Sequence, residues 1–149
     1  MTKMIFVNLP VADVEASAAF YAAVGFTKDD RFSQPGQAAS MQWSDTIVVM
    51  LLSHQHFANF TTKTIVDART SAQVLVCLSQ DSAAAVDAMV DSAVAAGGTA
   101  DPSPRQEMGD FMHGRSFEDP DGHIVEVMWM DVDKAMAAWS DPAAQAEPA

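Results

Sequence analysis

The chain carries the same order of predicted elements twice, and this internal repeat constrains its fold more than any other feature. Each copy reads strand, helix and then three strands, and it begins at Met4 in the first copy and at Ala72 in the second. Strands are predicted at residues 4–9, 26–32, 38–43, 46–52, 72–79, 99–105, 111–118 and 123–130. The strand at 26–32 is weakly patterned, and the one at 99–105 is a weak edge strand that contains Pro102 and Pro104. The repeat predicts an α+β fold made of two βαβββ modules.

Capping residues delimit the two predicted helices. Asp13 is a good N-cap, and Gly25 suits a helix C-terminus. The residues that recur at helical spacing between them, and should face the sheet, are Val14, Ala18, Tyr21 and Ala22. The second helix is predicted at residues 83–96, after Asp81 and Ser82.

The length and the order of elements predict a single domain. The 149 residues fit one unit of about 100–200 residues. We expect this domain at residues 1–131, with modules at 4–52 and 72–130. Residues 53–71 form a more polar connecting excursion, whose apolar side chains should pack on the chain's own sheet or on a partner subunit. Residues 132–149 form a short helix, at 132–139, and a frayed Ala/Pro-rich tail from Asp141 onward.

The charge of the chain argues against two classes of partner. The formal net charge is −12, and the few basic residues are scattered. Nucleic acids and anionic membranes require a basic face, so we expect neither as a partner. No apolar run approaches the roughly 18 residues of a membrane span, which makes the cytoplasm the expected compartment. The single cysteine, Cys77, lies in an apolar run and is predicted to be a buried core residue.

Three segments resemble the glyoxalase/bleomycin-resistance/dioxygenase superfamily, also called vicinal oxygen chelate proteins. Residues 9–21 resemble its first strand-to-helix junction, and residues 93–98 resemble the end of its second helix. Residues 117–127, Phe-Glu-Asp-Pro-Asp-Gly-His-Ile-Val-Glu-Val, resemble its closing hairpin, which is the most specific of the three. The likeness is strongest to the branch labelled as predicted lactoylglutathione lyases.

This resemblance implies a curled mixed sheet around a small-molecule cavity. Members are often homodimers, and some build the cavity across two chains. The metal-dependent members place one ligand on the first strand and one on the last strand of each half, usually His or Gln, Glu, His and Glu.

The family's metal pattern is only partly present. Glu126 matches the ligand on the last strand. The other three positions hold apolar residues, namely Phe6, Val74 and one of Val48, Met50 or Leu52, which do not bind such cations. Asn8 is a weak substitute, and His113 could approach Glu126 if the two share a face of the sheet. We therefore expect no resident cofactor, and a divalent metal on Glu126 and His113 is the alternative.

Strand alternation suggests which residues line the cavity. The candidates for the concave face are Phe6, Asn8, Trp43, Met50, Val74, Glu126 and Met128, and His113, Arg115 and Phe117 share a face of the penultimate strand. Most are apolar, as in typical ligand pockets. Glu126 is the candidate general base. The alternative is that Glu126 forms a structural ion pair with Arg115.

Three functions are compatible with these residues. The first is a protein that binds a small molecule in a mostly apolar cavity without metal, as in antibiotic sequestration. The second is a metal-dependent lyase, isomerase or dioxygenase-type enzyme that uses Glu126. The third is a dimeric scaffold without a ligand, which no residue specifically supports.

Overall fold

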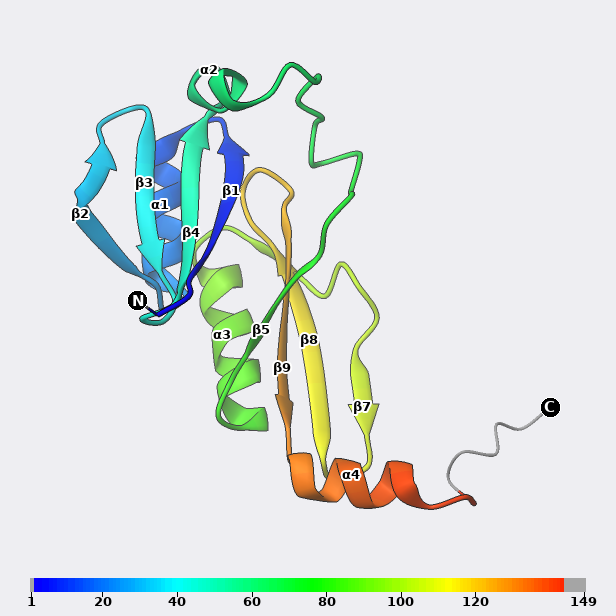
Figure 1. Ribbon diagram of the computed structural model, residues 1–149. Coiled ribbons are helices and arrows are strands. Elements are labelled where there is room, and N and C mark those ends of the chain that lie inside the picture. The colour runs from blue at the N-terminus through cyan, green and yellow to red at the C-terminus, as the bar shows by residue number, and fades with distance from the viewer. Residues whose placement is uncertain (1, 144–149) are drawn as a thin grey trace.

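The first module forms a four-stranded mixed sheet backed by one helix. The computed structural model describes residues 2–143 and is drawn in Figure 1. The elements of this module are β1 (Ile5–Val11), α1 (Val14–Ala23), β2 (Thr27–Gln34), β3 (Ala38–Gln42) and β4 (Ile47–Ser53). The strand order is β1-β4-β3-β2, with β1 parallel to β4 and the other pairs antiparallel.

The second module repeats this topology. Its elements are β5 (Val76–Ser79), α3 (Ala83–Ala95), β6 (Thr99–Ala100), β7 (Gln106–Met108), β8 (Met112–Glu118) and β9 (Ile124–Met130). β5 pairs in parallel with β9, as β1 does with β4, and β6 and β7 both pair with β8. Only the first two residues of the predicted strand at 99–105 form a strand, because Pro102 and Pro104 cannot donate to a ladder, and β7 begins just after its predicted end. The predicted α+β fold of two βαβββ modules is confirmed, with two sheets in place of one.

The remaining elements connect and extend the modules. The short helices α2 (His54–Phe57) and η1 (Ala58–Phe60) follow β4, and irregular chain then descends to β5 (Figure 1). We call residues 61–75 the connecting segment. After β9 comes α4 (Val132–Ser140), close to the predicted helix. The predicted tail extends into residues 144–149, which lie outside the described part of the chain. No helix in residues 2–143 has the length and apolar character needed to cross a membrane.

The predicted N-caps form as expected. The Asp13 carboxylate accepts from the N–H of Ala16, and the Ser82 hydroxyl accepts from the N–H of Ala85. Of the four residues expected to face the sheet from α1, Ala22 is exposed. Phe20 is buried in its place, because α1 packs against α3 as well as against its own sheet.

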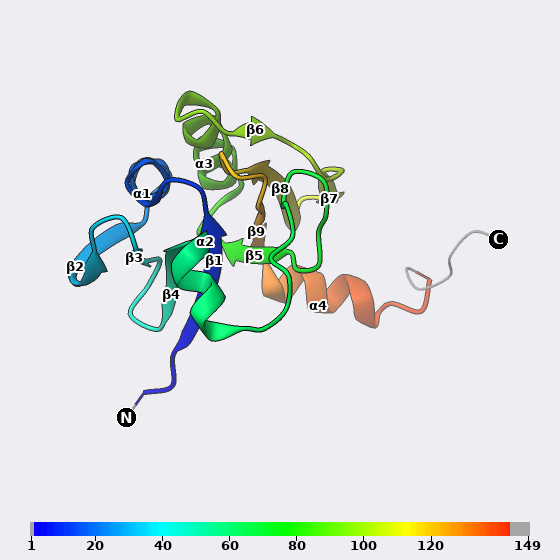
Figure 2. The same cartoon turned by 90° about the horizontal axis from the view of Figure 1, so that it is seen from above.

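One hydrophobic core joins the modules. Figure 2 shows α1 and α3 on the same side of the molecule, with β1 of one sheet beside β5 and β9 of the other. A chain of ring contacts runs through this core from Trp43 through Phe26, Tyr21 and Phe20 to Phe117, with centroid distances of 5.1–5.9 Å. The two modules are therefore one packing unit.

The turn between β8 and β9 ties the second module to the first. The Tyr21 hydroxyl donates to Asp119, and the Ala12 N–H donates to Asp121. The ring of His123 bonds the carbonyl oxygen of Pro10 at 2.7 Å. The Asp-Pro-Asp-Gly-His segment, the most specific sequence motif, thus has a structural role between the modules.

Candidate functional site

Each sheet has one face against the helices and one open face. In β9, Val125 and Val127 are buried in the core. Alternation therefore turns Glu126 and Met128 to the open face, as the sequence predicted. The register places Glu126 between Cys77 of β5 and Ser116 of β8, so these three residues form a row across adjacent strands.

His113, Arg115 and Phe117 share a face of β8 as predicted, but it is not the face of Glu126, so His113 does not approach Glu126. Arg115 pairs in register with Val127, and Phe117 pairs with Val125, so both share the core face. Phe117 is fully buried against Phe20. His113 has the same parity and lies near α3. All three side chains are on the face opposite Glu126, which also rules out the alternative of a Glu126–Arg115 ion pair.

Arg115 and His113 instead tie β8 to its surroundings. The Arg115 guanidinium donates to Asp101 at 2.8 and 3.1 Å and to Asp87 of α3 at 3.1 Å. These hydrogen bonds raise the pKa of Arg115 and lower the pKa of Asp101, while hydrogen bonds with His113 and then Arg115 lower the pKa of Asp87. The imidazole of His113 lies 3.0 Å from Asp87 and 3.4 Å from Glu107. This network holds α3 and the 101–107 region against β8.

Cys77 is exposed, which overturns its predicted place in the core. Leu78 is the residue of β5 that enters the core, and alternation turns Cys77 to the open face beside Glu126. Partial burial and the nearby Glu126 carboxylate raise the pKa of the Cys77 thiol. The thiol is therefore protonated at neutral pH and is a poor nucleophile.

The open face of the first sheet carries a separate recess of about 260 Å³. Asn8 and Met50, paired in register, line it as predicted. Sequence reasoning missed Phe32, His56 and Phe60, which also line it. Phe6 is 56% exposed on the same face. Trp43 was assigned to the wrong face, because it packs on Phe26 beside the core.

Glu126 does not reach the recess of the first sheet. Its surroundings enclose only about 20 Å³, next to Ser103 and Gln106. Within residues 2–143 its carboxylate makes no hydrogen bond or ion pair. Within residues 2–143, the two sheets therefore do not share a single cavity into which Glu126 projects.

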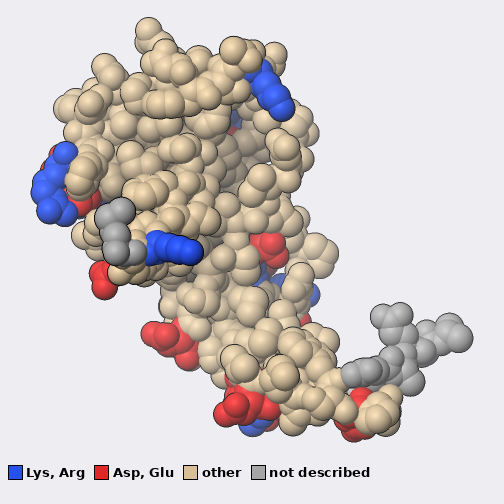
Figure 3. Space-filling view, viewed as in Figure 1, with Lys and Arg blue, Asp and Glu red and all other residues tan. Residues whose placement is uncertain are grey.

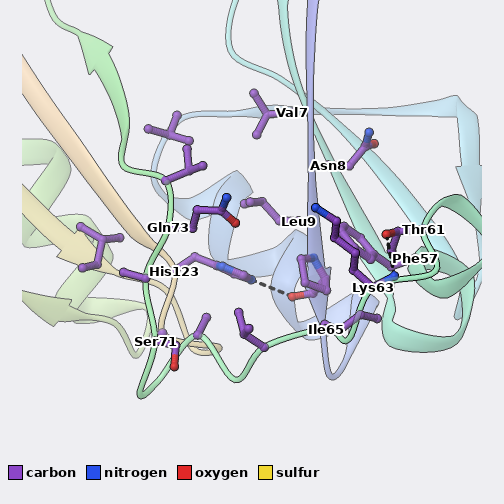
Figure 4. A pocket seen from close by; sticks show the side chains of 18 of the residues that line it. Val7, Asn8, Leu9, Phe57, Thr61, Lys63, Ile65, Ser71, Gln73 and His123 are labelled. Atoms are coloured by element: carbon purple, nitrogen blue, oxygen red, sulfur yellow. Dashed lines mark hydrogen bonds between the residues drawn. The ribbon is translucent and has the colours of Figure 1, made fainter.

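A cavity of about 390 Å³ lies between the modules, and we call it the intermodule cleft. Its floor is built from the edge strands, with Val7 and Leu9 of β1 facing Val76 of β5. The connecting segment forms its outer wall, which includes the predicted ligand-binding residue Val74 (Figure 4). Phe57 of α2 lies at one end. Part of the polar excursion thus packs on its own chain, while Phe60 remains 70% exposed.

A few polar groups interrupt the apolar lining of the intermodule cleft. His123 bonds the Pro10 carbonyl, and since a carbonyl can only accept, the proton lies on Nε2. In Figure 4 the amide of Gln73 and the ammonium of Lys63 lie on either side of Leu9. Neither group has a hydrogen-bond partner within residues 2–143. The positions of Gln73 and Lys63 depend on how the connecting segment folds back over β1, and no local sequence pattern predicts this.

Comparison with known proteins agrees with the motif and the fold. The model of the glyoxalase/bleomycin resistance protein/dioxygenase superfamily matches residues 3–127. The chain belongs to this superfamily. No curated protein matches it in sequence.

Several solved structures share the fold. A hypothetical protein from S. aureus is 27% identical over 87% of this chain and 94% of its own, with a TM-score of 0.70. A lactoylglutathione lyase from Agrobacterium tumefaciens is 19% identical over 86% and 93%, with a TM-score of 0.60. The bleomycin resistance determinant encoded on the transposon Tn5 is 20% identical over 87% and 99%, with a TM-score of 0.59. The last two likenesses concern the fold alone.

The residues of this superfamily member do not fit the usual four-ligand metal. Phe6 pairs with Val48 on the open face of the first sheet, and Asn8 pairs with Met50. In the second sheet, the metal-ligating atom next to the Glu126 carboxylate on β5 is the Cys77 sulfur. Within residues 2–143, no three His, Cys, Asp or Glu side chains are placed to hold a metal ion. Protein metal sites of this type use three or four ligands.

Proposed function

We propose that the chain binds a small molecule in the intermodule cleft. The observation that carries the proposal is a cavity of about 390 Å³ whose lining is mostly aliphatic and includes the Lys63 ammonium and the Gln73 amide, neither of which has a partner within residues 2–143. Ligand pockets commonly have volumes of about 300–1,000 Å³ and this composition. Val7, Leu9 and Phe57 would remove apolar ligand surface from water, and the polar groups would fix its orientation.

The cleft can be blocked without disturbing the core. Val74 is 67% exposed in the free chain, so Val74→Trp adds a ring to the wall of the cleft at little packing cost. Val94→Trp is the matched control, because Val94 is 47% exposed on α3 and does not line the cleft. The measurement is the fluorescence of anilinonaphthalene sulfonate titrated with each protein.

We expect Val74→Trp to weaken binding of this dye by about tenfold or more, and Val94→Trp to leave it unchanged. Equal binding by the wild type and Val74→Trp would place the dye elsewhere and contradict the proposal.

We also propose a homodimer, with a second copy covering the open face of the first sheet. Phe32 and Phe60 are 65% and 70% exposed there, and Phe6 extends the same apolar surface. Monomeric proteins rarely expose contiguous patches of this kind. Light scattering on a sizing column should give twice the mass of the chain. Phe32→Ser should shift the equilibrium toward the monomer, and a wild-type monomer at all concentrations would contradict the dimer.

A second candidate function rests on Glu126. Its carboxylate lies on an open sheet face without an ion pair in residues 2–143, beside Cys77 and Ser116, where it could act as a base. This corresponds to the lyase or dioxygenase-type enzyme suggested by the resemblance. Metal analysis of tag-free protein, with an assay of the methylglyoxal–glutathione adduct, tests it. Turnover or stoichiometric metal that Glu126→Gln abolishes would support this function, and the absence of both would exclude it.

A further inference from the structure

The intermodule cleft differs in charge from the rest of the chain. Asp and Glu account for 20 of the 149 residues, and the net charge is −12. None of the residues that line the cleft is Asp or Glu. In Figure 3 the acidic residues of this face gather over the second module and α4, while the surface above them shows few. The described lining of the cleft therefore presents no carboxylate to a negative ligand.

Lys63 is the one Lys or Arg that lines the cleft. Six of the eight basic residues in the chain form ion pairs, and the two without an ion pair within residues 2–143 are Lys3 and Lys63. Lys63 follows η1, where its backbone N–H donates to the Thr61 hydroxyl at 3.1 Å. This turn directs the side chain back over β1, as Figure 4 shows.

We propose that the intermodule cleft selects an amphipathic monoanion, an apolar body with one carboxylate, and that Lys63 binds the carboxylate. The inference rests on the proposed binding of a ligand in the cleft and adds its chemical class. The aliphatic floor takes the body, Lys63 meets the anion at the mouth, and the Gln73 amide can donate a further hydrogen bond.

The same charges argue against the other ligand classes. A cationic ligand would meet Lys63 with no carboxylate to offset it. A polyanion such as a di- or triphosphate would find a single ammonium, in a chain whose net charge of −12 repels multiple negative charge. A neutral ligand can accept a hydrogen bond from the Lys63 ammonium but gains no charge–charge attraction from it. A single carboxylate fits the one unpaired cation.

Three probes of equal chain length separate these classes: octanoate, octanol and octylamine, titrated calorimetrically at pH 7 and low salt. The wild type should bind octanoate about fivefold more tightly than octanol, a modest ratio because Lys63 is exposed to solvent. Octylamine should bind most weakly. Added salt should reduce the preference for octanoate without changing the affinity for octanol.

Lys63→Met keeps the aliphatic stem and removes the charge, and Lys3→Met is the matched control at the other unpaired lysine. We expect Lys63→Met to bind octanoate and octanol equally, and Lys3→Met to behave as the wild type. A preference for octanoate that survives in Lys63→Met, or that Lys3→Met also abolishes, would overturn the inference.

The same titrations distinguish failure of the inference from failure of the proposed function. The wild type could bind octanoate and octanol equally, with Val74→Trp weakening both. This result would support the cleft as a binding site and contradict the preference for an anion. No binding of any probe, together with no effect of Val74→Trp on the dye, would discard the cleft itself.

Discussion

The Tyr21 hydroxyl donates a buried hydrogen bond of 2.7 Å to Asp119, which joins α1 of the first module to the β8–β9 turn of the second. The other oxygen of Asp119 accepts from the N–H groups of Asp121 and His123 and so holds the turn in shape. Each module therefore depends on the other, because the same carboxylate organises the turn and anchors it to α1.

Tyr21→Phe should destabilise the chain by about 1–3 kcal/mol. The ring still packs against Phe20 and Phe26, but one oxygen of the buried Asp119 loses its donor. Urea unfolding followed by tryptophan fluorescence measures the difference. A change below about 0.5 kcal/mol would show that water or the neighbouring N–H groups replace the hydroxyl.

Ionisation of Tyr21, the one tyrosine of the chain, should set the pH above which the folded chain loses stability. Burial, followed by the negative charge of Asp119, raises the pKa of Tyr21 well above its usual value of 10.0. Above pH 10 the unfolded chain releases this proton and the folded chain keeps it, so the stability contribution present below pH 10 is lost as the pH rises. Absorbance at 295 nm should show tyrosinate only together with unfolding. A normal titration in the folded chain would contradict the buried placement.

Arg115→Met should cost about 1–2 kcal/mol at pH 7, because Asp101 and Asp87 lose their guanidinium partner. Hydrogen bonds from Arg115 and His113 lower the pKa values of these two carboxyls. Their contribution is therefore present above the unfolded value of 3.8 and is lost as the pH falls through the lowered pKa values. The stability difference between variant and wild type should shrink at acid pH. Dye binding in the intermodule cleft should not change, since Arg115 lies on another face.

Gly122→Ala should displace the connecting segment from the turn. Gly122 has a φ of 92°, and a methyl group there would lie 2.7 Å from backbone atoms of Arg69. Gly36→Ala is the control, because Gly36 has a φ of 71° and open space around it, so it carries only the conformational cost of about 1–2 kcal/mol. We expect Gly122→Ala to lose more stability, to be cleaved faster by proteases within residues 61–75 and to bind the dye more weakly. Equal behaviour of the two variants would mean that the contact with Arg69 is unimportant.

Ser17→Ala should leave stability unchanged or raise it by up to about 1 kcal/mol. The Ser17 hydroxyl is buried and has no hydrogen-bond partner within residues 2–143, and alanine also favours the helix. Ser116→Ala is the contrasting variant, because its buried hydroxyl accepts from the N–H of Ser103 and its loss should cost about 1 kcal/mol. Thermal unfolding of both variants tests the pair. A destabilised Ser17→Ala would indicate a bound water or another partner at that hydroxyl.

The sequence predicted correctly those features that depend on residues close together in the chain. Asp13 and Ser82 cap the helices as their side chains dictate, and the turn at Asp119–Gly122 forms where its residues require it. The alternation of β9 also predicted that Glu126 and Met128 share one face of the sheet, because the valines that alternate with them are buried on the other face.

The sequence did not predict the correct sheet face for residues that are covered, or left uncovered, by other elements of the fold. Arg115 and His113 appeared suitable for a pocket, but carboxylates from α3 and from the loop before β7 accommodate them on the core side. Cys77 sits in an apolar run like a core residue, yet β5 is a short edge strand with one face open.

The sequence by itself determined the two-module architecture, the helix boundaries and the superfamily, since these depend on spacing, capping and a local motif. The tertiary structure alone decided where the intermodule cleft lies. The intermodule cleft exists because the Tyr21–Asp119 hydrogen bond and the shared core bring β1 beside β5, and because the connecting segment folds over the gap. Contacts between residues so distant along the chain leave no periodic signal in it.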